Sequence, residues 1–246
     1  MHLSALPMLT RQGFLGPIHW AVVEAAAVED DGSILLTTSV GASPTFLSQA
    51  SHVLVELNAQ APAALRGFHD IYEPSLPPHR REIPIYAAAD RIGTELVKVD
   101  PKKIAGVVMT DERDELGGFD PPSEVTDRIG VLVAEFFAAE IAAGRIPKSF
   151  LPVQSGVGNV ANAVLGSLGR HPDIPPFPMY TEVIQDAVIG LMEHGRVPFA
   201  SGVSLTLSAT AMQGLLDRLE EFRGRLLLRP QEITNSPEVV RRLGVL

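Results

Sequence analysis

Three short apolar runs follow one another early in the chain, and each is bounded by residues that favour turns. They cover residues 18–28, 33–40 and 52–57. The runs are nearly continuously apolar instead of alternating with polar residues, which indicates strands buried on both faces of a sheet. Between the second and third runs, Pro44 directly after Ser43 predicts the start of a short helix. Together these features predict an α/β fold.

Helical periodicity dominates the second half of the chain. Apolar side chains recur at spacings of three and four from Val125 to Phe137, directly after the proline pair Pro121-Pro122. Three further amphipathic helices are predicted over residues 159–168, 182–193 and 209–222.

Two prolines follow the end of the long predicted helix within a few residues of each other. They are Pro147 and Pro152, and such a segment is typical of a linker between domains. We therefore predict a boundary near Lys148, with residues 1–147 in a first domain and residues 148–246 in a second.

Composition narrows the classes of function. The 246 residues carry 20 Lys and Arg against 29 Asp and Glu, a net charge of −9, which argues against a nucleic-acid partner. The absence of cysteine excludes thiolate nucleophiles and disulfides, and the seven histidines show no ligand spacing, so we expect no metal site. No secretory signal and no run of ~20 apolar residues is visible, so we expect a cytoplasmic protein that does not enter a membrane.

The segment with the most specific pattern is Gln154-Ser155-Gly156-Val157-Gly158-Asn159. Its glycines let the backbone approach a ligand, and the helix that follows presents unpaired N–H groups that can bind an anion or an oxyanion. The residues from Gly156 to Ala161 also match the dinucleotide-binding pattern G-x-G-x-x-A. Glu182 lies near the position at which this pattern places a ribose-binding acid. Three interpretations stay open at this point: a tight turn before a helix, an oxyanion site and a nicotinamide site. Pro152, which interrupts the expected strand, and the polar residues Asn159 and Asn162 in the helix count against the nicotinamide site.

Glu182 is the second candidate. A short apolar run ends at Thr181 and the helical pattern starts at once, which predicts that Glu182 lies at a junction between a strand and a helix. A carboxylate in a first helical turn is stabilised by the helix dipole, and that purely structural role is one interpretation. The other is a covalent nucleophile that attacks an activated acyl group, with the Gly156-Val157-Gly158 turn supplying an N–H donor to the oxyanion.

Several segments together resemble the acetyl-CoA hydrolase/transferase family, the class I CoA-transferases. The matching segments occur in the order found in the family and extend over nearly the whole chain. They are Val22–Glu24, Ser39–Gly41, Thr45–Leu47, Gly67–Ile71, Gln154–Leu165, Tyr180–Asp186 and Leu228–Gly244.

The resemblance implies a fold, a reaction and roles for individual residues. It implies two open-sheet domains of the CoA-transferase type. It also implies transfer of coenzyme A between succinyl-CoA or acetyl-CoA and a carboxylate such as acetate, or hydrolysis of acetyl-CoA. Glu182 would carry a covalent glutamyl-CoA thioester, and Val157 would donate its N–H to the oxyanion. The residues from Gln154 to Gly158 would line the site of the CoA thiol, with Asn159 in support, and CoA would be a substrate, not a permanently bound cofactor.

The resemblance also implies sequence segments that are not part of this chain. Its members begin with a glycine-rich CoA-binding segment before the counterpart of Met1 and continue past Leu246 with a second oxyanion donor. The resemblance therefore implies an internal portion, in which residues 1–147 are the rear of one domain and residues 148–246 the front of the catalytic one. We expect little turnover from this chain alone, and association through exposed strand edges, with a homodimer as the candidate assembly. A NAD-dependent dehydrogenase and a catalytically inactive fragment are the alternatives.

Overall fold

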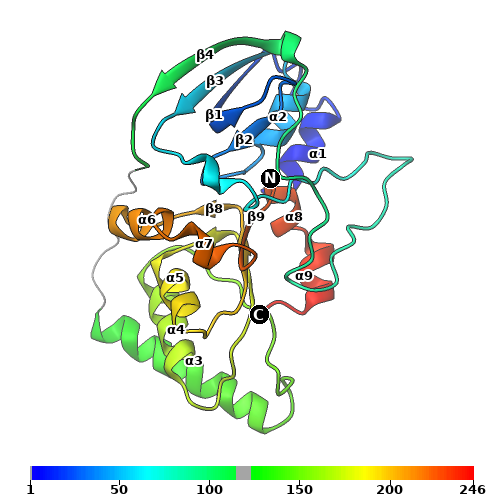
Figure 1. The fold of residues 1–246 in the computed structure, drawn as a ribbon. Coiled ribbons are helices and arrows are strands. Elements are labelled where there is room, and N and C mark those ends of the chain that lie inside the picture. The colour runs from blue at the N-terminus through cyan, green and yellow to red at the C-terminus, as the bar shows by residue number, and fades with distance from the viewer. Residues whose placement is uncertain (1, 115–122) are drawn as a thin grey trace.

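The computed structural model describes residues 2–114 and 123–246. Figure 1 shows a twisted sheet at one end of the molecule, a second set of strands in the middle, and one long helix lying across the opposite end. The proline pair Pro121-Pro122, predicted to precede the long helix, lies outside the described residues. The prediction of a mixed α/β fold with open sheets is confirmed.

The first sheet has the strand order β2-β1-β3-β4. Strands β1, β3 and β4 are parallel to one another, and β2 is antiparallel to β1. The early apolar runs form three of these strands, because their β-branched and aliphatic residues pack well on a pleated surface. The elements of this part are α1 (Ala5–Arg11), β1 (Trp20–Val28), β2 (Ile34–Leu36), α2 (Ser43–Gln49), β3 (His52–Asn58) and β4 (Ile104–Thr110).

The prediction that these strands are buried on both faces is wrong for β1. Ala21 and Val23 are buried in the core with Leu47 of α2, whereas Trp20 and Val22 on the opposite face are 57% and 68% exposed. Successive side chains of a strand point to opposite faces, so a continuous apolar run places half its side chains on whichever face lacks a covering layer. Figure 1 shows α1 and α2 together on one side of this sheet.

The second sheet is parallel, with the strand order β5-β7-β9, and a separate parallel pair joins β6 to β8. Isolated bridges extend the three-stranded sheet at both edges, from Val153 to Met179 and from His69 to Leu228. Residues of the first part of the chain therefore contribute to the second sheet. The strands are β5 (Met179–Tyr180), β6 (Val183–Ile184), β7 (Ala200–Gly202), β8 (Ser204–Leu205) and β9 (Leu226–Leu228).

Two of the predicted helices differ from the observed ones. The helix predicted from Glu182 begins only at Asp186, because residues 183–184 pair with β8 as an extended strand. The helix predicted over 209–222 is divided into two. The helices of this part are α3 (Glu124–Ala142), α4 (Asn159–Arg170), α5 (Asp186–Glu193), α6 (Ala209–Leu216), α7 (Leu219–Phe222), α8 (Gln231–Thr234) and α9 (Pro237–Leu243).

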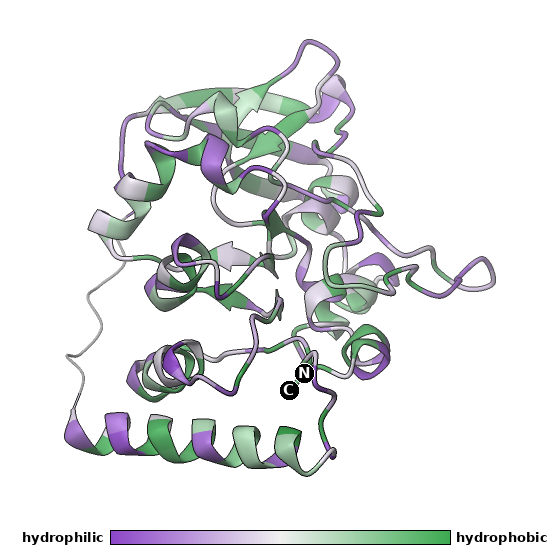
Figure 2. Ribbon diagram, turned by 60° about the horizontal axis from the view of Figure 1, so that its bottom comes forward, coloured by the Kyte–Doolittle hydropathy of each residue, from purple (hydrophilic) through white to green (hydrophobic). Residues whose placement is uncertain are grey.

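Helix α3 packs on α4 through its smallest residue. A side-chain carbon added at Gly130 would lie 2.5 Å from the carbonyl oxygen of Ala163, so the two helices approach too closely for any larger residue. The apolar residues at helical spacing on the other side of α3 are exposed, and Figure 2 shows this helix standing at the edge of the molecule. They are Val125, Ile129, Leu132 and Phe136.

A single cluster of buried apolar side chains runs from Val55 of the first sheet to Leu228 of the second. The boundary predicted at residues 147/148 stays a prediction.

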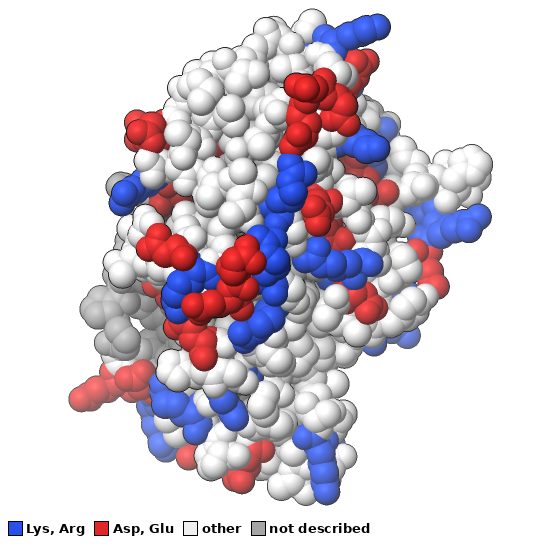
Figure 3. Space-filling view, in the orientation of Figure 1, with Lys and Arg blue, Asp and Glu red and all other residues white. Residues whose placement is uncertain are grey.

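Figure 3 shows basic side chains interspersed with acidic ones across the middle of one face. Ion pairs such as Arg223–Glu220 account for this mixing. Within residues 2–114 and 123–246, no helix is both long enough and apolar enough to span a bilayer.

Candidate active site

The Gln154–Gly158 segment runs along the edge of the second sheet beside β5. The Val153 N–H donates to the carbonyl oxygen of Pro178 at 3.0 Å, and the Tyr180 N–H donates to the Val153 carbonyl at 3.1 Å. This pairing carries the chain into the glycine turn next to the residues that follow β5. The predicted loop and the segment around Glu182 are therefore neighbours in space.

Thr181 links these two segments through its side chain. Its hydroxyl accepts a hydrogen bond from the Ser155 N–H at 3.1 Å and donates one to the Ser155 carbonyl at 3.0 Å. Thr181 is fully buried and Ser155 is nearly so, which shields both hydrogen bonds from competition with water. The residue directly before Glu182 thus fixes the start of the glycine turn.

Gln185 holds the other end of the same turn. Its amide nitrogen donates to the Gly156 carbonyl at 2.5 Å, and its amide oxygen accepts from the Gly158 N–H at 3.3 Å. Gln185 is fully buried, so its amide needs both partners to satisfy its hydrogen-bonding groups. The two bonds straddle Val157, whose side chain is 62% exposed.

The arrangement leaves more than one backbone donor of this turn unpaired among the described residues, including the Gly156 N–H. The Val157 N–H has no acceptor within the described residues, and it lies directly before the N-terminus of α4. Gly158, the N-cap position of that helix, has a φ of 113°, a conformation that side chains with a Cβ rarely adopt. A free N–H beside a helix N-terminus is well suited to stabilise a negative charge.

Glu182 lies in a bend between β5 and β6 and is half-buried. The prediction of a direct junction with a helix is wrong, because β6 intervenes and Glu182 lies four residues before α5. The stabilising effect of a first helical turn therefore belongs to Asp186 instead, which accepts hydrogen bonds from both the N–H and the hydroxyl of Ser208.

A third segment reaches this region from the first sheet. The Val203 N–H donates to the Glu182 carbonyl at 2.6 Å, and the Val203 carbonyl accepts from the Val40 N–H at 2.9 Å. Ser39 forms an isolated bridge with Ser204. No pattern in the sequence assigns a role to the Ser39–Gly41 run, and only its place among the resembling segments indicates that it belongs near the site.

His69 and Asp70, neighbours within a resembling segment, bind different partners. The Nε2 atom of His69 lies 2.9 Å from the Thr37 carbonyl, to which it donates, and burial lowers the pKa of His69 to about 4. The Asp70 carboxylate pairs with the guanidinium of Arg229, and both side chains are buried. Neither residue reaches the glycine turn through a hydrogen bond. Within the described residues no cluster of three or more His, Asp or Glu could hold a metal ion.

Comparison with known proteins places these features in one family. Residues 1–109 match the model of the acetyl-CoA hydrolase/transferase N-terminal domain. The whole chain is 44% identical to the propanoyl-CoA:succinate CoA transferase of Escherichia coli K12, over 50% of that protein. The chain belongs to the acetyl-CoA hydrolase/transferase family. Other members of the family are an acetyl-CoA hydrolase of Eremothecium gossypii, 40% identical over 48% of its length, and a succinyl-CoA:acetate CoA-transferase of Clostridium kluyveri, 38% identical over 46%.

The fold agrees with that of a solved CoA-transferase. The 4-hydroxybutyrate CoA-transferase of Porphyromonas gingivalis superimposes with a TM-score of 0.65 at 20% identity, covering 97% of this chain and 51% of that one. This likeness concerns the fold alone. The chain spans about half the length of the curated relatives described above. None of these relatives is a nicotinamide enzyme, so the dehydrogenase alternative gains no support from them.

Proposed function

We propose that this chain carries the nucleophile and one oxyanion donor of an enzyme that transfers coenzyme A from an acyl-CoA to a carboxylate, or hydrolyses acetyl-CoA. One observation carries the proposal. The buried side chains of Thr181 and Gln185, on either side of Glu182, both bind the 155–158 loop and leave the Val157 N–H without a protein acceptor among the described residues.

The proposed reaction begins with attack by a Glu182 oxygen on the thioester carbonyl of the acyl-CoA. The carbon–sulfur bond breaks, CoA leaves as the thiolate, and a mixed anhydride between Glu182 and the acyl group remains. The thiolate then attacks the glutamyl carbonyl, which releases the original acyl group as a carboxylate and leaves a glutamyl-CoA thioester. Each step passes through an oxyanion, and the Val157 N–H is the proposed donor to that charge.

The second half of the reaction determines which activity results. If a carboxylate attacks the glutamyl-CoA thioester, the same steps run in reverse and a new acyl-CoA forms. If water attacks instead, free CoA is released and the net reaction is hydrolysis. Both activities occur among the relatives. In the reaction proposed here, both would proceed through the same glutamyl-CoA thioester. CoA is thus proposed as a substrate that becomes covalently attached, with Gln154–Gly158 near its thiol and Asn159 at the first turn of α4.

Chemical trapping tests the proposed nucleophile. The chain is incubated with acetyl-CoA or succinyl-CoA, treated with borohydride and digested, and the peptides are mapped by mass. Reduction of the Glu182 side chain to an alcohol is the expected result, because borohydride reduces thioesters but not carboxylates. Glu182→Gln should abolish the modification, whereas Glu124→Gln, at an exposed position on α3, should leave it unchanged.

The contrary result is equally clear. Protein that is folded, that binds CoA and that shows an unmodified Glu182 after this treatment contradicts a covalent role for this residue. Light scattering of the same sample gives the molar mass and tests the homodimer, which stays a prediction, as does the cytoplasmic location.

A further inference from the structure

Helix α3 has an apolar stripe that no other part of the described structure covers. Its four side chains are each between 37% and 68% exposed, and they are Val125, Ile129, Leu132 and Phe136. Their spacing of four, three and four residues is that of a coiled-coil seam, in which apolar side chains face a partner helix. We call this stripe the outer seam. An exposed apolar surface of this kind marks an interaction site.

The outer seam is distinct from the face of α3 that packs on α4. Gly130 and Ala134 are buried on that face, and Gly130 approaches the carbonyl oxygen of Ala163 in α4. At 3.6 residues per turn, these two positions lie about 130–170° around the helix axis from the middle of the outer seam. Figures 1 and 2 show α3 lying across one end of the molecule, with α4 on its inner side. The contact with α4 therefore leaves the outer seam available to a partner.

The charges beside the outer seam complement each other. Arg128 and Glu135 flank it on the same side, and both are exposed. Neither forms an ion pair within residues 2–114 and 123–246, whereas Glu140, nearer the end of the same helix, pairs with Arg145. In paired helices, residues that flank an apolar seam form the ion pairs that set the orientation of the partner. A helix with one basic and one acidic flanking residue is therefore suited to pair with a copy of itself.

Two such helices fit together when they run in opposite directions. With Ile129 opposite Leu132 of the other copy, the same register places Val125 opposite Phe136. All four apolar residues of each seam then face an apolar residue of the other, and each basic flanking residue lies beside the acidic one of the other copy. This pairing has a twofold axis, which is the commonest symmetry of protein dimers.

A parallel arrangement lacks these ionic contacts. It places Arg128 beside Val133 of the other copy. It places Glu135 beside Glu140, which carries the same charge and already pairs with Arg145. Neither flanking charge gains an opposite partner in this way, so the antiparallel arrangement is favoured.

A lipid surface fits the outer seam less well than a second copy does. Helices that lie on membranes carry basic residues on their polar face, because the lipid headgroups are often anionic. On the exposed part of α3, the acidic residues Glu124, Asp127 and Glu135 outnumber Arg128. The charge of the helix therefore favours a protein partner.

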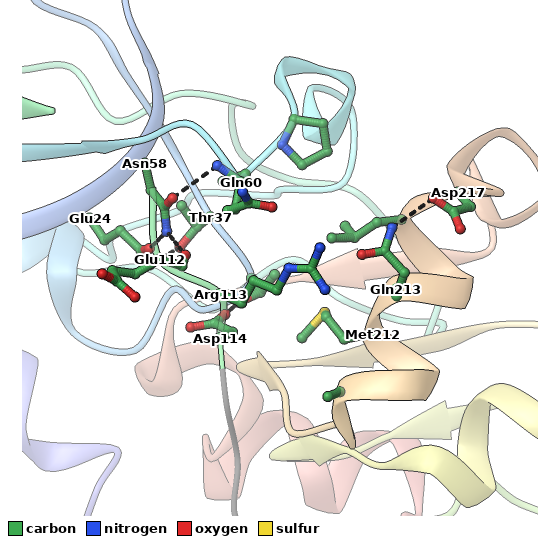
Figure 4. Close-up of a pocket in the computed structure, with 15 residues that line it drawn as sticks. Glu24, Thr37, Asn58, Gln60, Glu112, Arg113, Asp114, Met212, Gln213 and Asp217 are labelled. Carbon is green, nitrogen blue, oxygen red and sulfur yellow. Dashed lines mark hydrogen bonds between the residues drawn. The ribbon is translucent and has the colours of Figure 1, made fainter. Parts of the chain in front are cut away.

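The cavity near the first sheet offers no comparable docking surface. It has a volume of about 280 Å³ and lies between this sheet and α6, and Figure 4 shows polar side chains such as Gln60 and Gln213 on its walls. Among the described residues that line it, four are acidic and only Arg113 is basic. An apolar helix placed there would remove these charges from water, which is unfavourable.

We propose that two copies of this chain associate through an antiparallel pair of α3 helices. The outer seams are in contact, and Arg128 of each copy lies beside Glu135 of the other. This surface differs from the strand edges through which the sequence predicts association. It includes no residue of the candidate active site, so the proposal does not depend on the proposed function.

Sedimentation velocity of the whole chain over a wide range of concentration tests the surface. We expect the mass to rise toward twice the 26.4 kDa of one chain. Leu132→Glu places a charge in the middle of the outer seam and should weaken association about tenfold or more. Val131→Glu is the matched control, because Val131 is an apolar residue of α3 with a similar exposure, 39% against 47%, but lies outside the seam. Circular dichroism checks that both variants are folded.

A charge exchange tests the orientation. Arg128→Glu alone and Glu135→Arg alone each bring like charges together in the antiparallel pair, so each should weaken association severalfold. The two substitutions combined should restore the original affinity, since they recreate both ion pairs with the signs reversed. Parallel pairing predicts no such rescue.

Four results overturn the proposal. They are a mass of 26.4 kDa at every concentration, a folded Leu132→Glu variant that associates like the original chain, an equal loss in Val131→Glu, and a double charge variant that associates no better than the single ones. Association through strand edges gives the second result. Failure of the proposed function is recognised separately, because borohydride trapping of Glu182 does not require the outer seam.

Discussion

Replacing Gln185 by methionine tests whether the glycine turn is held for catalysis. Methionine has a similar length and fills the buried space, but it can neither donate to the Gly156 carbonyl nor accept from the Gly158 N–H. Two neutral hydrogen bonds at about 0.5–1.5 kcal/mol each give a loss of unfolding free energy of about 1–3 kcal/mol. The chain remains folded if its stability is in the usual range.

The expected kinetic effect is larger than the effect on stability. If the turn relaxes, the Val157 N–H leaves the position where the oxyanion forms, and one oxyanion donor contributes about 2.7–4 kcal/mol, or a factor of 10²–10³ in rate. We therefore expect the rate at which CoA becomes attached to Glu182 to fall by about 10²–10³ in Gln185→Met. The affinity for CoA should change much less, because the oxyanion exists only in the transition state.

The assay combines two measurements on the same samples. Quenched-flow mass spectrometry gives the rate of CoA attachment, and hydrogen exchange of the peptide that contains Gly158 reports whether the turn has loosened. Gln49→Met, at an exposed residue of α2, controls for the substitution itself. A folded Gln185→Met protein that reacts at the original rate while Gly158 exchanges faster refutes the link between the turn and the chemistry.

Three further predictions concern stability. Gly158→Ala should lower the unfolding free energy by about 1–3 kcal/mol because its φ of 113° strains any residue with a Cβ, whereas Gly156→Ala, where an added Cβ meets no atom within 4 Å, should have little effect in the same urea titration. Gly130→Val should cost about 1–3 kcal/mol by forcing α3 away from Ala163, and an unchanged melting temperature would contradict the close helix contact. His69 binds a proton more weakly in the folded state, with a pKa of about 4, than in the unfolded state at about 6.5. The unfolded state therefore gains protons first as the pH falls, so about 3 kcal/mol of stability present above pH ~6.5 is lost progressively toward pH ~4. His69→Gln should flatten that part of the stability profile, and an equally steep decline in the variant would show that other groups cause it.

Part of this fold and site was predictable from local sequence. Three of the four strands of the first sheet, the helix after Gly158 and the glycine at a position with positive φ follow from β-propensity, periodicity and the conformational freedom of glycine. The matching segments also indicate the family, because their amino-acid sequences and their order along the chain can be recognised without a structure. These features depend on residues close together in the chain, or on a motif that can be recognised from the amino-acid sequence alone.

The relations between distant segments required the tertiary structure. Glu182 was expected next to a helix, but residues 183–184 become a strand because β8 lies alongside to accept and donate hydrogen bonds. The long apolar pattern of α3 was correct as a helix, yet its spacing does not reveal that Gly130 makes the buried contact.

The sequence by itself determined the class of fold, the family and the candidate nucleophile, because these reside in local patterns and motifs. Only the tertiary structure decided how the site is held together. Thr181 and Gln185 bind a loop that lies 26 to 29 residues earlier in the chain. A buried hydrogen bond of this kind depends on where two segments meet in space, and no periodicity or spacing in the chain encodes that meeting.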